Sequence, residues 1–149
     1  GSAYAAEIGT MKVSEEVDAL KSMVFNITKF LILPRVFATT ISVPALTIFA
    51  DLMGIIGGVV AASFILDISL VRFLNQAQQA IQYWDIFTGL FKSVLFGAVI
   101  GMVGCFRGLQ VSGGAESVGK YTTQAVVTSI FLIILIDAVF TVMFQLLGI

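Results

Sequence analysis

The stretch QAVVTSIFLIILIDAVFTVMFQLL, from Gln124 to Leu147, decides the fold class of this chain. It carries one charged residue, Asp137, and it exceeds the ~20 residues that a helix needs to cross the hydrocarbon core of a bilayer. Two further apolar stretches, about 36–66 and about 86–106, are also long enough to cross. The sequence therefore predicts an all-α protein, a polytopic bundle of membrane helices forming one domain over residues 1–149.

The overall composition indicates a lipid environment. Hydrophobic residues make up 58% of the 149 residues and charged residues only 11%, against about a quarter in soluble domains. The net charge of -1 gives no basis for nucleic-acid binding. The chain has no histidine and one cysteine, Cys105, which lies in an apolar run. The sequence shows no nucleophile–base pair and no cluster of metal ligands, so we predict no catalytic residue, no metal site and no cofactor.

Small residues and a proline mark special positions in the predicted helices. The first span is longer than a bilayer requires, so it could tilt or it could be broken. Pro44 should kink it, and Asp51 with the segment GIIGG at 54–58 makes a second weak point. Gly97 and Gly101 in the second span form a G-x-x-x-G pair suited to tight helix contact. The N-terminal segment has its own small-residue face, made of Gly1, Ala5 and Gly9, and looks like the tail of a preceding membrane helix.

The distribution of lysine and arginine predicts the orientation of the spans. With three spans, segments 1–36 and 107–123 lie on the same side of the membrane. That side carries six basic residues: Lys12, Lys21, Lys29, Arg35, Arg107 and Lys120. The opposite side carries one, Arg72. We therefore predict that the basic side is cytoplasmic and that the C-terminus faces outward.

The connection between the first two spans, residues 67–86, has the pattern of an amphipathic helix. Its apolar positions fall on one helical face: Leu70, Leu74, Ala77, Ile81 and Trp84. Glutamine and asparagine side chains fall mostly on the other face. This pattern predicts a helix lying at the outer interface, with Tyr83 and Trp84 at the level of the lipid headgroups.

A second amphipathic helix is predicted on the cytoplasmic side over about 14–24. Its apolar stripe is spaced at i, i+4, i+7 and i+11 and consists of Val13, Val17, Leu20 and Val24. Ser14 can cap this helix, and Glu15 and Glu16 suit its first turn. Such a helix can dock a partner protein or lie on the bilayer surface, and the residues alone do not choose between the two.

Three ionisable residues lie inside the predicted spans. Asp51 is about 15 residues into the first span, roughly 22 Å from its inner end. Asp137 lies at a similar depth in the third span. A charge at such a depth is costly unless it is paired or hydrated, so these carboxyl groups either fix helix packing through hydrogen bonds or face a polar cavity or a bistable contact. Lys92, in the outer part of the second span, is a possible partner for Asp51, or it extends outward to the headgroups.

The segment GGAESVGKYTT, from Gly113 to Thr123, is almost a phosphate-binding P-loop. A true P-loop joins a strand to a helix, and its lysine is followed by Ser or Thr. Here Tyr121 follows Lys120, and a membrane span precedes the loop. We therefore predict no nucleotide site, a tight turn at the glycines, and a cap on the last helix from Thr122 or Thr123.

Several stretches together resemble the MlaE family of ABC-transporter permeases. They are AAEIGTMKVSEEVDALKSM (5–23), LPRVFA (33–38), FADLMGIIGG (49–58) and RGLQVSGGAESVGKYTTQAVV (107–127). The match covers nearly the whole chain and corresponds to the C-terminal portion of the family. By this resemblance, EIGTMKVSEEVDAL is the coupling helix that contacts the ATPase subunit. The residues that the resemblance assigns to ATPase coupling are Glu7, Val13, Glu16, Val17, Asp18 and Leu20.

The resemblance implies a permease subunit that moves phospholipids between membranes and maintains lipid asymmetry. ATP would be hydrolysed by a separate ABC ATPase subunit, so the chain itself would not be an enzyme. The implied assembly is a permease homodimer in the cell inner membrane that meets an MCE-domain lipid-binding protein on the outer, periplasmic side. The alternative is a membrane scaffold or sensor that docks a cytoplasmic partner and transports nothing. An intramembrane lipid enzyme is the weakest hypothesis, because the sequence shows no nucleophile or metal site.

Overall fold

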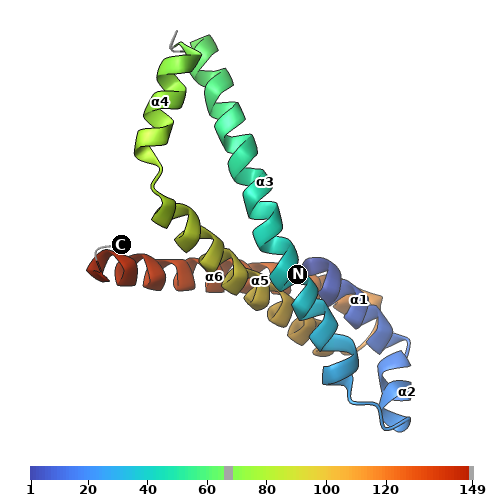
Figure 1. Cartoon of the computed structure of the whole chain (residues 1–149). Helices are drawn as coiled ribbons and strands as arrows, with labels where there is room; N and C mark the ends of the chain where they lie inside the picture. Colours follow the sequence, from blue (N-terminus) through green and yellow to red (C-terminus); the bar gives the residue numbers. More distant parts are fainter. Residues whose placement is uncertain (66–68, 148–149) are drawn as a thin grey trace.

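The computed structural model of the chain describes residues 1–65 and 69–147 (Figure 1). Its elements are α1 (Ser2–Val13), α2 (Glu16–Ser22), the π-helical segment η1 (Thr28–Ile32), α3 (Leu33–Ile65), α4 (Leu70–Ala80), α5 (Tyr83–Leu109) and α6 (Ala115–Leu147). The predicted end of the first span at Leu66, the first residues of the outer connection and the C-terminal Ile149 lie outside the described residues.

Among the residues that the structure describes, three helices are long and apolar enough to cross a membrane, which confirms the predicted all-α membrane fold. They cover Thr28–Phe64, Tyr83–Leu109 and Ala115–Leu146. Their surfaces are mostly uncovered: only 6%, 17% and 6% of their most apolar windows are buried within the chain. Lipid or other helices must therefore cover these surfaces, because apolar area of this extent is not stable in water.

The first span is a single unbroken helix. Pro44 lies inside α3, and the helix continues past it and past the segment at 54–58, where a break was one of the two expectations. A proline removes one backbone donor, and in lipid the neighbouring helical bonds have no water to compete with them. Phe73 of α4 packs on this helix at Gly58, where an added Cβ would lie 3.0 Å from the ring.

A ridge of glycines on α5 brings the other helices into close contact. Gly97, Gly101, Gly104 and Gly108 are all buried. A Cβ at Gly97 would lie 2.6 Å from the carbonyl oxygen of Thr39 in α3, and one at Gly104 would lie 2.6 Å from the carbonyl oxygen of Gly1. The predicted tight contact at Gly97 and Gly101 is therefore present, and the ridge extends it to α1.

The small-residue face at the N-terminus packs as predicted. Ala5 and Gly9 are buried in α1, and a Cβ at Gly9 would lie 2.8 Å from a methyl group of Val111. Through this face α1 lies against both α5 and α6 (Figure 1). The three elements form one packed unit from which α3 extends toward α4.

The predicted outer interfacial helix is shorter than expected. It forms α4 but ends at Ala80, and Ile81 has an extended backbone. Gln82 and Asp85 then form a capping box that starts α5, in which each side chain accepts a hydrogen bond from the other residue's backbone N–H. Trp84 therefore belongs to α5, and the prediction that it shares a face with Leu74 was wrong.

Filling the ridge should loosen the packing of α3 on α5. We expect Gly97→Ala in the full-length protein to lower the free energy of unfolding by about 1–3 kcal/mol, because its Cβ would meet the backbone of Thr39. Gly89→Ala on the same helix is the matched control, since no atom lies within 4 Å of its Cβ. It should be neutral or stabilising by up to ~1 kcal/mol. Thermal unfolding in detergent measures both, and equal effects of the two variants would contradict the ridge.

Candidate functional site

The basic end of the molecule, which contains α2 and the six lysine and arginine residues predicted to face the cytoplasm, is built around a small apolar cluster. Ile8 of α1, Val17 of α2, Leu31 of η1 and Cys105 of α5 are all at most 5% exposed and pack together. The seven-residue α2 is too short to be stable alone, since isolated helices need about 12–15 residues. Burial of Val17 therefore fixes α2 on the ends of α1 and α5.

Polar contacts tie the same end together. Arg35 of α3 donates to Glu7 of α1, with 2.6 Å between Nη2 and Oε1. The Arg35 side chain is 17% exposed, so this ion pair is partly shielded from solvent. Lys12 Nζ donates to the carbonyl oxygen of Leu109, the last residue of α5. The first helix is thereby bonded to the start of one span and to the end of another.

The predicted continuous helix over 14–24 is not formed. Ser14 ends α1, Glu15 has a positive φ of 61°, and α2 begins at Glu16. The hydroxyl of Ser14 donates to carbonyl oxygens of α1 and to Glu16 Oε1, so it does not cap α2. This break also divides the predicted apolar stripe.

The stripe residues consequently point in different directions. Val17 is 1% exposed, whereas Val13 is 38% and Val24 is 92% exposed. Leu20 is partly exposed. Val17 therefore contacts the chain's own core, and a partner protein could reach only the other stripe residues.

An exposed apolar tip follows α2. We define the tip as Met23, Val24 and Phe25, which are 63%, 92% and 49% exposed. Val24 has a φ of 62°, a conformation that costs a β-branched residue about 1–3 kcal/mol. Phe25 packs on Phe30, with 5.7 Å between the ring centroids. Large apolar side chains presented in this way are typical of a contact surface.

The helix that precedes the tip, α2, carries several charged residues. Lys21 Nζ lies 2.9 Å from Asp18 Oδ1, and both side chains are more than half exposed. The hydrogen bond from Lys21, together with its positive charge, lowers the pKa of Asp18 below the usual range. Asp18 therefore keeps its negative charge at neutral pH, and Glu16 on the same helix is exposed.

Lys92 forms an ion pair inside the membrane, but its partner is Asp137. Lys92 Nζ lies 3.0 Å from Asp137 Oδ1 and 3.1 Å from Thr141 Oγ1. It also lies 5.7 Å from the centroid of the Phe144 ring. The Lys92 side chain is 19% exposed and that of Asp137 is 51% exposed. The pair thus joins α5 to α6, and the suggested partnership with Asp51 was wrong.

Asp51 lies instead on an open groove between α3, α4 and α5, in the angle seen in Figure 1. The groove has a volume of about 700 Å³. It is lined by Ile48, Ala50, Asp51, Leu52, Gly54, Ile55, Phe73, Ala77, Ile81, Asp85, Ile86 and Leu90. Within the described part of the chain Asp51 makes no ion pair. An apolar groove with carboxylates at its surface can accommodate hydrocarbon together with a polar group.

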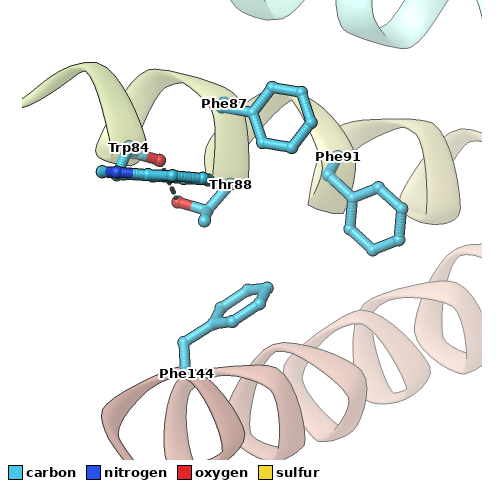
Figure 2. A pocket seen from close by; sticks show the side chains of 5 residues that line it. All are labelled: Trp84, Phe87, Thr88, Phe91 and Phe144. Atoms are coloured by element: carbon cyan, nitrogen blue, oxygen red, sulfur yellow. Dashed lines mark hydrogen bonds between the residues drawn. The ribbon is translucent and has the colours of Figure 1, made fainter. Parts of the chain in front are cut away.

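An aromatic pocket lies beside the Lys92–Asp137 pair. Trp84, Phe87 and Phe91 of α5 and Phe144 of α6 line a cavity of about 250 Å³. Figure 2 shows the Phe144 side chain pointing from α6 toward α5. Thr88 completes the lining, and its hydroxyl donates to the carbonyl oxygen of Trp84 over 2.9 Å. The Thr88 hydroxyl is therefore already hydrogen-bonded, and with the four aromatic rings the pocket presents a mainly apolar surface suited to hydrocarbon.

The near-P-loop segment has no loop geometry around its lysine. Gly113, with a φ of 99°, forms the predicted tight turn, and α6 already begins at Ala115. Lys120 therefore lies within a helix, where the backbone N–H groups are used by the helix itself. Thr122 and Thr123 donate to the carbonyl oxygens of the preceding turn, so they do not cap the helix.

Comparison with known proteins gives a consistent result. The sequence profile of the family described as permease MlaE matches residues 1–143. The chain is 46% identical over 133 residues to a probable ABC transporter permease protein of Synechocystis sp., covering 89% of this chain and 51% of the relative. It is 37% identical over 144 residues to a probable ABC transporter permease protein of Rickettsia prowazekii, covering 97% and 56%. It is 38% identical over 144 residues to the chloroplastic protein TRIGALACTOSYLDIACYLGLYCEROL 1 of Arabidopsis thaliana, covering 97% and 41%.

The three spans and these relatives define a membrane protein of the ABC-transporter permease class. Within that class, the chain belongs to the MlaE permease family. It spans about half the length of the curated relatives that it matches. The resemblance seen in the sequence motifs is therefore confirmed at the level of the family.

Sequence reasoning missed several contacts of this site. The role of Arg35 as the partner of Glu7 was not predicted, although both residues stand in the family motifs. The aromatic pocket was also missed, because its residues come from two spans and carry no periodic signal that differs from ordinary lipid-facing positions. The signal for the Lys92 pair was available: a lone lysine and a lone aspartate in two adjacent spans.

Breaking the intramembrane ion pair should expose its strength. Lys92→Met leaves Asp137 without its cation, so we expect a loss of stability on the order of 2 kcal/mol. The double variant Lys92→Met with Asp137→Leu should lose less than the single one, because no unpaired charge remains. Lys29→Met, outside the pair, is the control. The native protein, the single variants Lys92→Met and Asp137→Leu, and the double variant form a double-mutant cycle of unfolding free energies, and strictly additive effects would contradict the pair.

Proposed function

We propose that this chain is part of a permease subunit that moves phospholipids between membranes, driven by a separate ABC ATPase. The observation that carries this proposal is the membership of the chain in an ABC permease family, together with a short charged helix, α2, that packs through Val17 against α1 and α5. The permease would lie in the cell inner membrane, with the C-terminus on the periplasmic side. A permease homodimer and an outer MCE-domain lipid-binding protein complete the proposed assembly.

The proposed substrate class is supported by the kind of surface that the spans present. The groove beside Asp51 and the aromatic pocket beside Phe144 are both mainly apolar and both open, as an acyl chain requires. The name of the Arabidopsis relative contains that of a glycolipid, trigalactosyldiacylglycerol. Lipid is therefore the substrate most compatible with these surfaces and this kinship.

We propose that α2 and the apolar tip together are the ATPase contact. Glu16, Asp18 and Leu20 retain their proposed roles, because they remain at least partly exposed. Val17 and Glu7 support the contact from within the chain and do not touch the ATPase. Val17 anchors α2 in the core, and Glu7 connects α1 to α3 through Arg35. Val13 borders the contact at the end of α1.

Reconstitution tests the function directly. The full-length permease should co-purify with an ATPase, and in proteoliposomes ATP should drive the transfer of fluorescent phospholipid to acceptor vesicles. A scaffold or sensor would bind a partner without any ATP-dependent transfer. Absence of transfer by a complex that still hydrolyses ATP would refute the transport proposal and favour the scaffold.

The proposed ATPase contact predicts opposite effects on stability and binding at one residue. Val24→Gly should raise the free energy of unfolding by about 1 kcal/mol, because glycine accepts a positive φ. The same change removes an apolar contact and should weaken ATPase binding. Val24→Asp should weaken it more, by about 2–4 kcal/mol, because a charge enters an apolar interface.

Co-purification and thermal unfolding measure the two effects in the same samples. Ser112→Asp, in the exposed turn between α5 and α6, is the control for an added charge at the same end of the molecule. Val17→Asp is expected to destabilise the fold itself and serves as a reference for indirect loss of binding. If Val24→Asp binds the ATPase as well as the native protein does, the contact lies elsewhere.

The proposed topology is tested by labelling single cysteines in a Cys105→Ala background. An impermeant thiol reagent added to spheroplasts should label Gln79→Cys on α4. It should leave Ser22→Cys and Ser117→Cys unlabelled until the membrane is permeabilised, because both lie at the basic, cytoplasmic end. Labelling of Ser117→Cys in intact spheroplasts would reverse the assignment of the sides.

A further inference from the structure

One face of α6 changes from basic to apolar along the helix. Lys120, Val127, Phe131 and Ile134 are spaced by seven, four and three residues, so they lie on the same side of the helix. Val127 is 62% exposed, and Phe131 and Ile134 are each 64% exposed. The face thus begins with a cation at the basic end and continues as an uncovered apolar stripe toward the membrane centre.

An open groove marks the transition between the two parts of this face. It has a volume of about 410 Å³ and is lined by Lys120, Thr123, Gln124, Val127 and Thr128. Thr128 Oγ1 accepts a hydrogen bond from Arg107 Nη2 over 3.0 Å, which places the guanidinium at the edge of the groove. The lining therefore combines a cation, hydroxyl and amide groups, and an apolar residue at the end nearer the stripe.

Lys120, which lines the groove, and Arg107, which reaches its edge at Thr128, have no carboxylate partner among the residues that the structure describes. Arg107 donates only to Gln110 and Thr128, and Lys120 takes part in no ion pair formed by residues 1–65 and 69–147. The half-buried Arg107 in particular retains donors for an anion. A phosphate group is the anion for which such cations, with the amide of Gln124 beside them, are suited.

We propose that this groove binds the headgroup of an anionic phospholipid at the inner membrane interface, with an acyl chain along Val127, Phe131 and Ile134. The proposal rests on the proposed function for its orientation and its lipid class. Charge selects this occupant over a second copy of the chain. A two-fold contact through the same face would bring Arg107 and Lys120 of both copies together, and like charges would oppose it.

Photo-cross-linking tests this site in the full-length permease bound to its ATPase. The probe is phosphatidylglycerol with a diazirine on its acyl chain, diluted into phosphatidylcholine nanodiscs. We expect cross-links on residues 127–134 of α6, identified by mass spectrometry. Arg107→Gln combined with Lys120→Gln should reduce this labelling about tenfold, because each cation near anionic lipid contributes to binding. Lys29→Gln, which removes a cation at the same end outside the groove, should leave it unchanged.

Three results would overturn the site. They are undiminished labelling of the double variant, equal labelling of α6 by the matching phosphatidylcholine probe, and an intermolecular disulfide at Gln124→Cys that shows a second copy on this face. If the double variant does not fold, Lys120→Gln alone, at an exposed position, should still reduce labelling severalfold. Native protein that labels but transfers no lipid would refute the transport function and keep the site. Active transfer with labelling unaffected by the variants would refute the site alone.

Discussion

The close approach of backbones along the glycine ridge of α5 is the contact on which the rest of the structure depends. Most of the apolar surface of the spans is uncovered within the chain, so helix association cannot rely on large buried side chains. At Gly97 the backbone of α3 comes so near that a single Cβ would collide with it, and at Gly104 the same holds for the start of α1. In lipid, where apolar side chains gain little by leaving their surroundings, such close contact is a main source of helix association.

The hydrocarbon surroundings also explain where the charges lie. Lys92 and Asp137 satisfy each other between α5 and α6, and Thr141 accepts another hydrogen bond from the ammonium group. Asp51 has no such partner among the described residues and lies on an open groove. An ionised carboxylate in that position needs water or a further polar group, whereas Asp137 already has Lys92 as its partner. The Lys92–Asp137 pair is complete within the chain, whereas Asp51 has no cation as partner among the described residues.

The sequence predicted the number and the order of the spans, because length and hydropathy indicate them, but the first and third helices begin earlier than predicted, at Thr28 and Ala115. It also predicted the tight contacts of Gly97, since small residues at helical spacing have one main use between membrane helices. It failed for Val17 and for the partner of Lys92. An amphipathic stripe reports which residues avoid water, but it does not distinguish a contact within the chain from one with a partner. Likewise, Asp51 and Asp137 lie at similar depth, so the sequence cannot decide which of them pairs with Lys92 until the rotation of each helix about its axis is known. The start of α5 at Tyr83 was missed because a capping box interrupted an apparently continuous periodicity.

The arrangement of α1 has a mechanical consequence for any partner that contacts α2. Because α2 is held mainly by Val17, a displacement of α2 acts on the core cluster that contains Ile8 of α1 and Cys105 of α5. Helix α1 is in turn joined to α3 by the ion pair between Glu7 and Arg35, and it packs against α6. The residues through which α1 contacts the spans are close-packed, and close-packed helices shift as rigid bodies more readily than their side chains rearrange. We therefore expect a displacement of the short helix α2 to reach all three spans, and we expect the glycine ridge, which has no side chains that could rearrange, to transmit it from α5 to α3.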